Sequence, residues 1–142
     1  MSSVLLSPEM EKISIQIPSI PENIRIVESF IDNAKEQFHI TDDLYGNIMV
    51  AVTESVNNAI KHGNSCDRSK NVNISLFIEP KMLKFVVEDQ GPGFDPDTLP
   101  DPTLPENISK PDGRGIFLMR SLCDELEFLN EGRVVEMKFN MN

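Results

Sequence analysis

The sequence has few basic residues. Lysine and arginine number 13 against 23 aspartates and glutamates, which gives the 142-residue chain a formal net charge of −10. A protein that binds duplex DNA neutralises phosphates with clustered lysine and arginine, and no such cluster occurs in this sequence. The composition therefore argues against direct nucleic-acid binding and favours proteins or small molecules as partners.

Cysteine and long hydrophobic runs are also scarce. The two cysteines, Cys66 and Cys123, do not have metal-ligand spacing, which favours reduced thiols over a zinc site or a disulfide. No apolar segment reaches the length of a membrane span, and residues 1–8 lack the basic and apolar regions of a signal peptide. We therefore expect a cytoplasmic protein that does not bind a membrane.

The length and composition suit one compact domain. Of the 142 residues, 39% are hydrophobic, which is enough to bury one core but not a second. We expect residues 1–10 to form a flexible tail and residues 11–142 to form a single domain. The segment at about 94–112 is crowded with proline and aspartate and shows no sustained period. We interpret it as an ordered loop or a mobile lid.

Hydrophobic periodicity predicts five strands and three helices. In chain order these are a strand through Ile13–Ile17, helices over 21–38 and 41–63, strands over 72–79 and 82–89, a helix over 113–124, and strands over 126–128 and 134–139. Ser19 and Glu22 have the spacing of a capping box for the first helix, and Thr41 is placed to cap the second. This order predicts an α+β fold, a two-layer α/β sandwich with helices on one face of a mostly antiparallel sheet.

The second helix carries two polar residues that need an explanation. Glu54 and Asn58 lie four residues apart and therefore share one helical face. They flank an apolar stripe that we expect to pack on the sheet, formed by Leu44, Ile48, Ala51, Val52, Ser55 and Ala59. The amide oxygen of Asn58 could fill one position of a Mg²⁺ site completed by phosphates and water, and Glu54 could act as a general base. A solvated helix edge is the alternative.

A second motif follows an apolar strand and consists of Asp89, Gly91 and Gly93. At the edge of a buried pocket, the Asp89 carboxylate would accept a hydrogen bond from the adenine amino group and would repel the oxygen of guanine. The two glycines would allow the backbone to approach the base closely. A plain turn is the alternative for so short a motif.

A third motif opens the last helix. Gly113 and Gly115 leave N–H groups available at the positive end of the helix dipole, where phosphates bind, and Arg114 between them adds positive charge. A glycine-rich start of a helix without any ligand is the alternative. The three motifs occur in one order, each at the structural edge that its chemistry needs, and together they favour a nucleotide site.

The three motifs resemble the nucleotide-binding boxes of the Bergerat ATP-binding fold, and they read Glu54-x-x-x-Asn58-Ala59, Asp89-x-Gly91-x-Gly93 and Gly113-x-Gly115. The run from Asn57 to Gly63 and the length of the chain most resemble the anti-sigma factor serine/threonine kinases of partner-switching systems. The resemblance implies ATP and Mg²⁺ as cofactors and transfer of the γ-phosphate to a STAS-domain anti-anti-sigma protein. It further implies that a sigma factor can be a second partner and that the protein can form a homodimer.

By position, the resemblance also implies roles for single residues. Glu54 would be the catalytic base that accepts the proton of the substrate hydroxyl, Asn58 would bind Mg²⁺, and Asp89 would read adenine. The residues that shape the nucleotide pocket would be Gly91, Gly93, Gly113 and Gly115.

The sequence departs from the family pattern beside the third motif. Family members often place a basic residue there to contact the γ-phosphate, whereas this chain has Pro111 and Asp112. Lys110 or Arg114 would then have to make that contact.

Two further functional classes are open at this stage. The first is a binding module without catalytic activity, which sequesters a regulatory protein and uses the nucleotide as a conformational signal. Glu54 favours the kinase over this module, because nucleotide binding alone needs no base. The second is a histidine-kinase catalytic domain, which is disfavoured because no helix pair with a phosphoacceptor histidine is predicted ahead of the domain.

Overall fold

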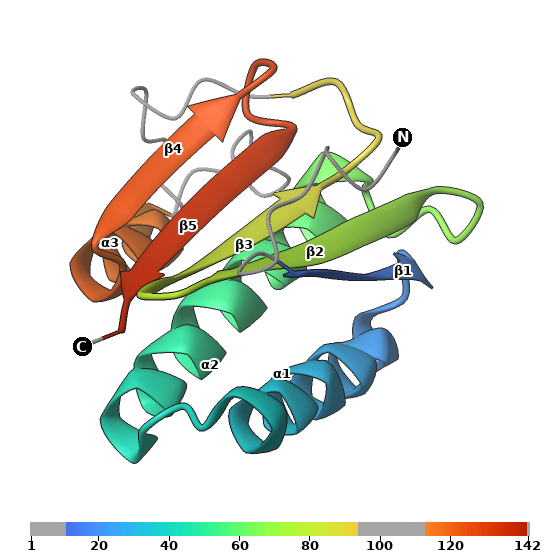
Figure 1. The fold of residues 1–142 in the computed structure, drawn as a ribbon. Helices are drawn as coiled ribbons and strands as arrows, with labels where there is room; N and C mark the ends of the chain where they lie inside the picture. Colours follow the sequence, from blue (N-terminus) through green and yellow to red (C-terminus); the bar gives the residue numbers. More distant parts are fainter. Residues whose placement is uncertain (1–10, 94–112, 142) are drawn as a thin grey trace, which may run out of the picture.

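The computed structural model of the protein describes residues 11–93 and 113–141 (Figure 1). Its elements, in chain order, are β1 (Glu11–Pro18), the 3-10 turn η2 (Pro21–Asn23), α1 (Ile24–Phe38), α2 (Asp42–Asn58), the π-helical turn η3 (Ala59–Gly63), β2 (Asn71–Glu79), β3 (Met82–Glu88), α3 (Gly113–Leu122), β4 (Glu125–Leu129) and β5 (Val134–Asn140). Each strand and helix expected from the sequence is present. The expected tail at residues 1–10 and the lid at about 94–112, which includes Lys110, lie outside the described residues.

The strands form one sheet in the order β1-β2-β3-β5-β4, and each neighbouring pair is antiparallel. Figure 1 shows α1, α2 and α3 together on one face of this sheet. The predicted α+β two-layer sandwich is therefore confirmed. β3 is the central strand, and Asp89 directly follows its last residue. Asp89 therefore lies at the end of the middle strand, far from both edge strands.

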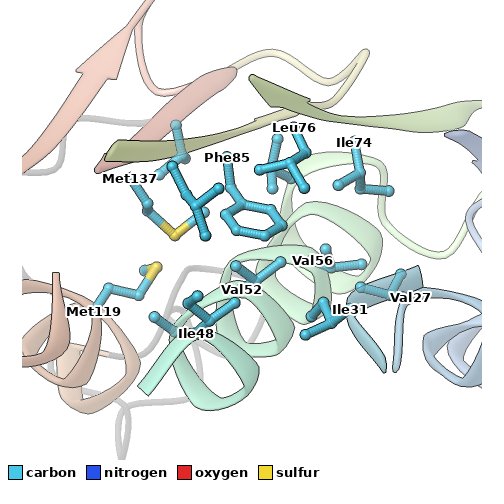
Figure 2. Packing of buried hydrophobic residues seen from close by; sticks show 14 of the residues in the cluster. Val27, Ile31, Ile48, Val52, Val56, Ile74, Leu76, Phe85, Met119 and Met137 are labelled. Atoms are coloured by element: carbon cyan, nitrogen blue, oxygen red, sulfur yellow. The ribbon is translucent and has the colours of Figure 1, made fainter. Parts of the chain in front are cut away.

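Alternate residues of the strands face the helices and form the core. Leu76 of β2 and Phe85 of β3 lie opposite Val52 of α2 (Figure 2). The apolar stripe predicted for α2 is buried or partly buried in this core. Burying one such side chain stabilises the fold by about 1.5–3 kcal/mol, so the core fixes the rotation of α2 about its axis. Glu54 and Asn58 flank the stripe and are consequently held half-buried at the border between core and solvent.

The two predicted helix caps have different outcomes. Thr41 caps α2 as predicted, because its Oγ1 accepts a hydrogen bond from the backbone N–H of Leu44 at 3.3 Å. The capping box predicted at Ser19 is wrong, and α1 begins through η2 without a side-chain cap. The Ser19 hydroxyl is buried, donates to the carbonyl oxygen of Lys70 at 2.8 Å, and accepts from Asn64 Nδ2 at 2.7 Å. These tertiary bonds replace the local cap.

The end of the second helix also differs from the prediction of a regular helix up to Gly63. The α-helix ends at Asn58, and the chain continues as the π-helical turn η3. Such turns widen the helix by one residue and are frequent at functional sites. In this structure η3 brings Gly63 so close to Asp89 that a Cβ at position 63 would lie 2.5 Å from the carboxylate carbon. The turn therefore joins the end of α2 to the end of β3.

Gly46 offers a test of this placement of α2. It lies inside the helix, is exposed, and a Cβ there would meet no atom within 4 Å. We expect Gly46→Ala to raise the free energy of unfolding by about 0.5–1 kcal/mol, because alanine loses less backbone entropy in a helix. Urea denaturation measures this change. Gly63→Ala is the matched control and should destabilise; similar destabilisation by both substitutions would contradict the exposed position of Gly46.

Candidate active site

A small hollow lies between α2 and the sheet, where β3 ends. Its lining comes from every layer of the fold and consists of Ser55, Asn58, Ala59, Gly63, Val87, Asp89, Met119, Phe128, Gly132 and Val135. Asn58 and Asp89, predicted from two separate motifs, therefore face the same space. The hollow has about 20 Å³ of room for the centres of water-sized molecules, and one water needs about 10–15 Å³.

Asp89 is the charged group at the base of this hollow. It is 9% exposed, and its Oδ1 accepts a hydrogen bond from the backbone N–H of Gly91 at 2.8 Å. Burial raises the pKa of the Asp89 carboxyl, while the Gly91 N–H and the nearby Arg133 guanidinium oppose this rise. An ionised carboxylate has several acceptor positions, so Asp89 keeps the capacity to accept a hydrogen bond from a ligand.

The two glycines after Asp89 are each required by contacts inside the protein. A Cβ at Gly91 would lie 1.6 Å from the carbonyl oxygen of Gly63, which no side chain can tolerate. Gly93 has φ +88°, and a Cβ there would lie 2.4 Å from the carbonyl oxygen of Glu131. The close neighbours of these glycines in the structure are therefore η3 and the β4–β5 turn. Contact with a base remains a prediction.

Glu54 and Asn58 converge on the first turn of α3. A Cβ at Gly115 would lie 2.8 Å from Glu54 Oε2 and 3.7 Å from Asn58 Nδ2, so glycine at this position makes room for both head groups. Gly113 begins the same helix, and Arg114 is exposed on its first turn. The carboxylate, the amide and the start of α3 thus form one continuous polar edge beside the hollow.

The residues at this edge fit a Mg²⁺ ion that is also bound by phosphates. Amide and carboxylate oxygens are the ligands that Mg²⁺ uses in proteins, usually one or two of them with water and phosphate oxygens. Within residues 11–93 and 113–141, no group of three or more histidine, cysteine, aspartate or glutamate side chains could hold a metal ion alone.

Two residues that the sequence did not single out hold this site in place. Arg133 donates from Nε to the carbonyl oxygen of Gly91 at 2.6 Å and from Nη2 to that of Pro92 at 3.0 Å. Asn64 is 1% exposed, and its Oδ1 accepts from the backbone N–H of Gln90 at 2.7 Å. Neither residue belongs to a motif, and their partners lie 42 and 26 positions away along the chain, so no local signal could have identified them.

The fold and the site together define an ATPase-like domain. Its helix α2 carries Glu54 and Asn58 and packs on an antiparallel sheet, and the buried Asp89 follows the central strand of that sheet. Residues 17–139 match the family model of the histidine kinase-like ATPase domain, and the chain belongs to this family. In the described part of the chain, no helix combines the length and the hydropathy needed to cross a membrane.

Several curated relatives are named serine-protein kinase or anti-sigma F factor. The serine-protein kinase RsbW of Bacillus velezensis is 27% identical in an alignment of 144 positions, gaps included, that covers 96% of this chain and 90% of that protein. The anti-sigma F factor of Clostridium perfringens is 38% identical in an alignment of 102 positions, gaps included, that covers 67% of this chain and 71% of that protein. These relatives confirm the resemblance to anti-sigma factor kinases that the sequence motifs indicated.

A solved structure supports the fold. The structure of the RsbU and RsbW domains of Rv1364c from Mycobacterium tuberculosis superposes with a TM-score of 0.65 at 13% identity. The match covers 93% of this chain and 32% of that longer chain.

Because the Asp89 carboxyl is buried, we expect its substitution to have different effects on thermal stability and on ATP binding. Because burial raises its folded-state pKa, its contribution to stability is favourable at low pH and is lost as the pH rises through that pKa. At neutral pH, Asp89→Asn removes the burial of a charge and should leave the melting temperature unchanged or higher. The same substitution should weaken ATP binding by more than about tenfold, because the amide oxygen of asparagine is engaged by the Gly91 N–H and its NH₂ group, a donor, then faces the adenine amino group.

Thermal unfolding and calorimetric titration with ATP measure these two effects. In the unsubstituted protein, ATP affinity should also fall as the pH is lowered through the raised pKa of Asp89, because the oxygen not bonded to the Gly91 N–H then carries a proton and donates. Unchanged ATP affinity in Asp89→Asn would remove Asp89 from the adenine site.

Proposed function

We propose that the protein is an ATP-dependent serine/threonine kinase that phosphorylates a STAS-domain anti-anti-sigma protein. The observation that carries the proposal is the convergence of Glu54 and Asn58 on the first turn of α3, beside a hollow that ends at Asp89. Relatives named serine-protein kinase and anti-sigma F factor support the same activity.

In this proposal each residue acts on a different part of the nucleotide. Asp89 accepts a hydrogen bond from the adenine amino group, and the backbone N–H groups from Gly113 to Gly115 bind the phosphates at the start of α3. Asn58 holds Mg²⁺, which neutralises charge on the phosphates when it is bound. Arg114 or Lys110 contacts the γ-phosphate.

Glu54 acts on the protein substrate. Its carboxylate takes the proton from the serine or threonine hydroxyl as that oxygen attacks the γ-phosphorus. The bond from the γ-phosphorus to the β–γ bridging oxygen breaks, and ADP leaves. Phosphoryl transfer depends mainly on positioning and charge stabilisation, so one base beside a helix N-terminus forms a sufficient set of protein groups. The half-buried position of Glu54 leaves it within reach of a substrate that approaches from solvent.

The proposal extends to the setting in which the kinase works. We place it in the cytoplasm as a homodimer that can also bind a sigma factor, with phosphorylation of the STAS protein separating the kinase from that substrate. The net charge of −10 makes proteins rather than nucleic acids the expected partners.

The decisive experiment is transfer of labelled γ-phosphate from Mg-ATP to each STAS protein encoded in the same genome. We expect label on a serine or threonine of one of them. In Glu54→Gln, transfer should fall by at least about a hundredfold while ATP affinity stays within about twofold, because the base is lost and the binding groups remain. Glu36→Gln, an exposed substitution on α1, is the matched control and should transfer normally.

The outcomes separate the proposed kinase from its alternative. Full transfer by Glu54→Gln would exclude Glu54 as the base. No label on any STAS protein, with ATP binding intact, would favour a binding module that uses ATP as a conformational signal. That reading also predicts that Glu54→Gln still sequesters its partner protein.

A further inference from the structure

The hydroxyl of Ser55 is unusual among the helical hydroxyls of this protein. A serine or threonine inside a helix commonly donates to the carbonyl four residues earlier. Thr53, two residues before Ser55, does so to Met49 at 2.6 Å, and Ser121 of α3 does so to Phe117 at 2.9 Å. Ser55 Oγ is buried and has no hydrogen-bond partner in the described structure.

The position of Ser55 shows where its missing partner would lie. The residue is 2% exposed, so bulk water does not satisfy the hydroxyl. It lines the same hollow as Asn58 and Asp89, on the side formed by α2. The buried Nδ2 of Asn58 also has no partner. Two side chains of α2 that carry unpaired polar atoms, Ser55 and Asn58, therefore line the hollow that the proposed function assigns to the nucleotide.

A buried hydroxyl without a partner costs about 1–3 kcal/mol, and native proteins keep few such groups. Alanine would fit the same place in the apolar stripe without this cost. A ligand or a bound water that pairs with the hydroxyl gives a physical reason for serine at position 55.

The side chains of Asp89 and Ser55 offer complementary hydrogen-bonding groups. The Asp89 carboxylate only accepts hydrogen bonds, whereas the Ser55 hydroxyl can donate one. Adenine presents an amino donor together with ring nitrogens that only accept. Asp89 can pair with the amino group and Ser55 with a ring nitrogen, so the pair reads both kinds of group on one base.

We propose that Ser55 is a specificity-determining residue of the adenine subsite, whose hydroxyl donates a hydrogen bond to a purine ring nitrogen, directly or through one water molecule. This inference rests on the proposed ATP-dependent function. The hollow has room for about one water in the absence of a base, which suits either form of the contact.

The test combines one substitution with two nucleotide analogues. Ser55→Ala should melt at the same or a higher temperature without nucleotide, because it removes an unpaired buried hydroxyl. Its affinity for ATP, measured by calorimetry, should fall about tenfold, the equivalent of one hydrogen bond. Ser121→Ala removes a hydroxyl from α3 that is exposed and already bonded, and its ATP affinity should not change.

The analogues identify the atom that is read. Either 1-deaza-ATP or 7-deaza-ATP should bind the unsubstituted protein about tenfold more weakly than ATP. In Ser55→Ala, the affinity for that analogue should equal the affinity for ATP, because the hydroxyl that distinguishes the two nucleotides is gone. Unchanged ATP affinity in Ser55→Ala, or an analogue penalty that persists in this variant, would overturn the role of Ser55 and leave the kinase proposal intact. Failure of the unsubstituted protein to bind ATP would instead overturn both.

Discussion

The site depends on one close approach, between the last turn of α2 and the end of β3. The carbonyl oxygen of Gly63 lies where a side chain at Gly91 would begin, and the Asp89 carboxylate packs against Gly63. Two bonded side chains, Asn64 and Arg133, fix the backbone on either side of this contact. The approach brings the helix that carries Glu54 and Asn58 next to the strand that is followed by the buried Asp89. Without it, the two polar groups would belong to separate surfaces.

Charge is distributed unevenly around this contact. The chain as a whole is acidic, and the Asp89 carboxyl is buried despite the cost of burying a charge, which raises its pKa. The groups that offset this cost are local, namely one backbone N–H and the Arg133 guanidinium. The start of α3 adds the positive end of a helix dipole beside Glu54 and Asn58. An anionic nucleotide would therefore be attracted by the site itself rather than by the surface.

Local patterns were sufficient for the architecture and for the residues with distinctive chemistry. The alternation in the strands and the helical spacing of α2 come directly from which side chains are apolar, and they predicted the layers of the fold. The Thr41 cap was predictable because its partner is three residues away. Glu54, Asn58 and Asp89 could be singled out because polar groups beside an apolar stripe, or after an apolar strand, need a reason.

Contacts between distant segments could not be predicted in the same way. Ser19 has a capping sequence, yet its hydroxyl bonds to Lys70 and Asn64 because the chain brings that loop beside it. The π-helical form of η3, the Arg133 bonds and the unpaired hydroxyl of Ser55 likewise depend on neighbours from other elements. The sequence by itself determined which elements form and which polar residues are candidates for the site. Only the tertiary structure decided which of them share one hollow, because hydrogen-bond partners and steric limits across the fold are set by distance in space.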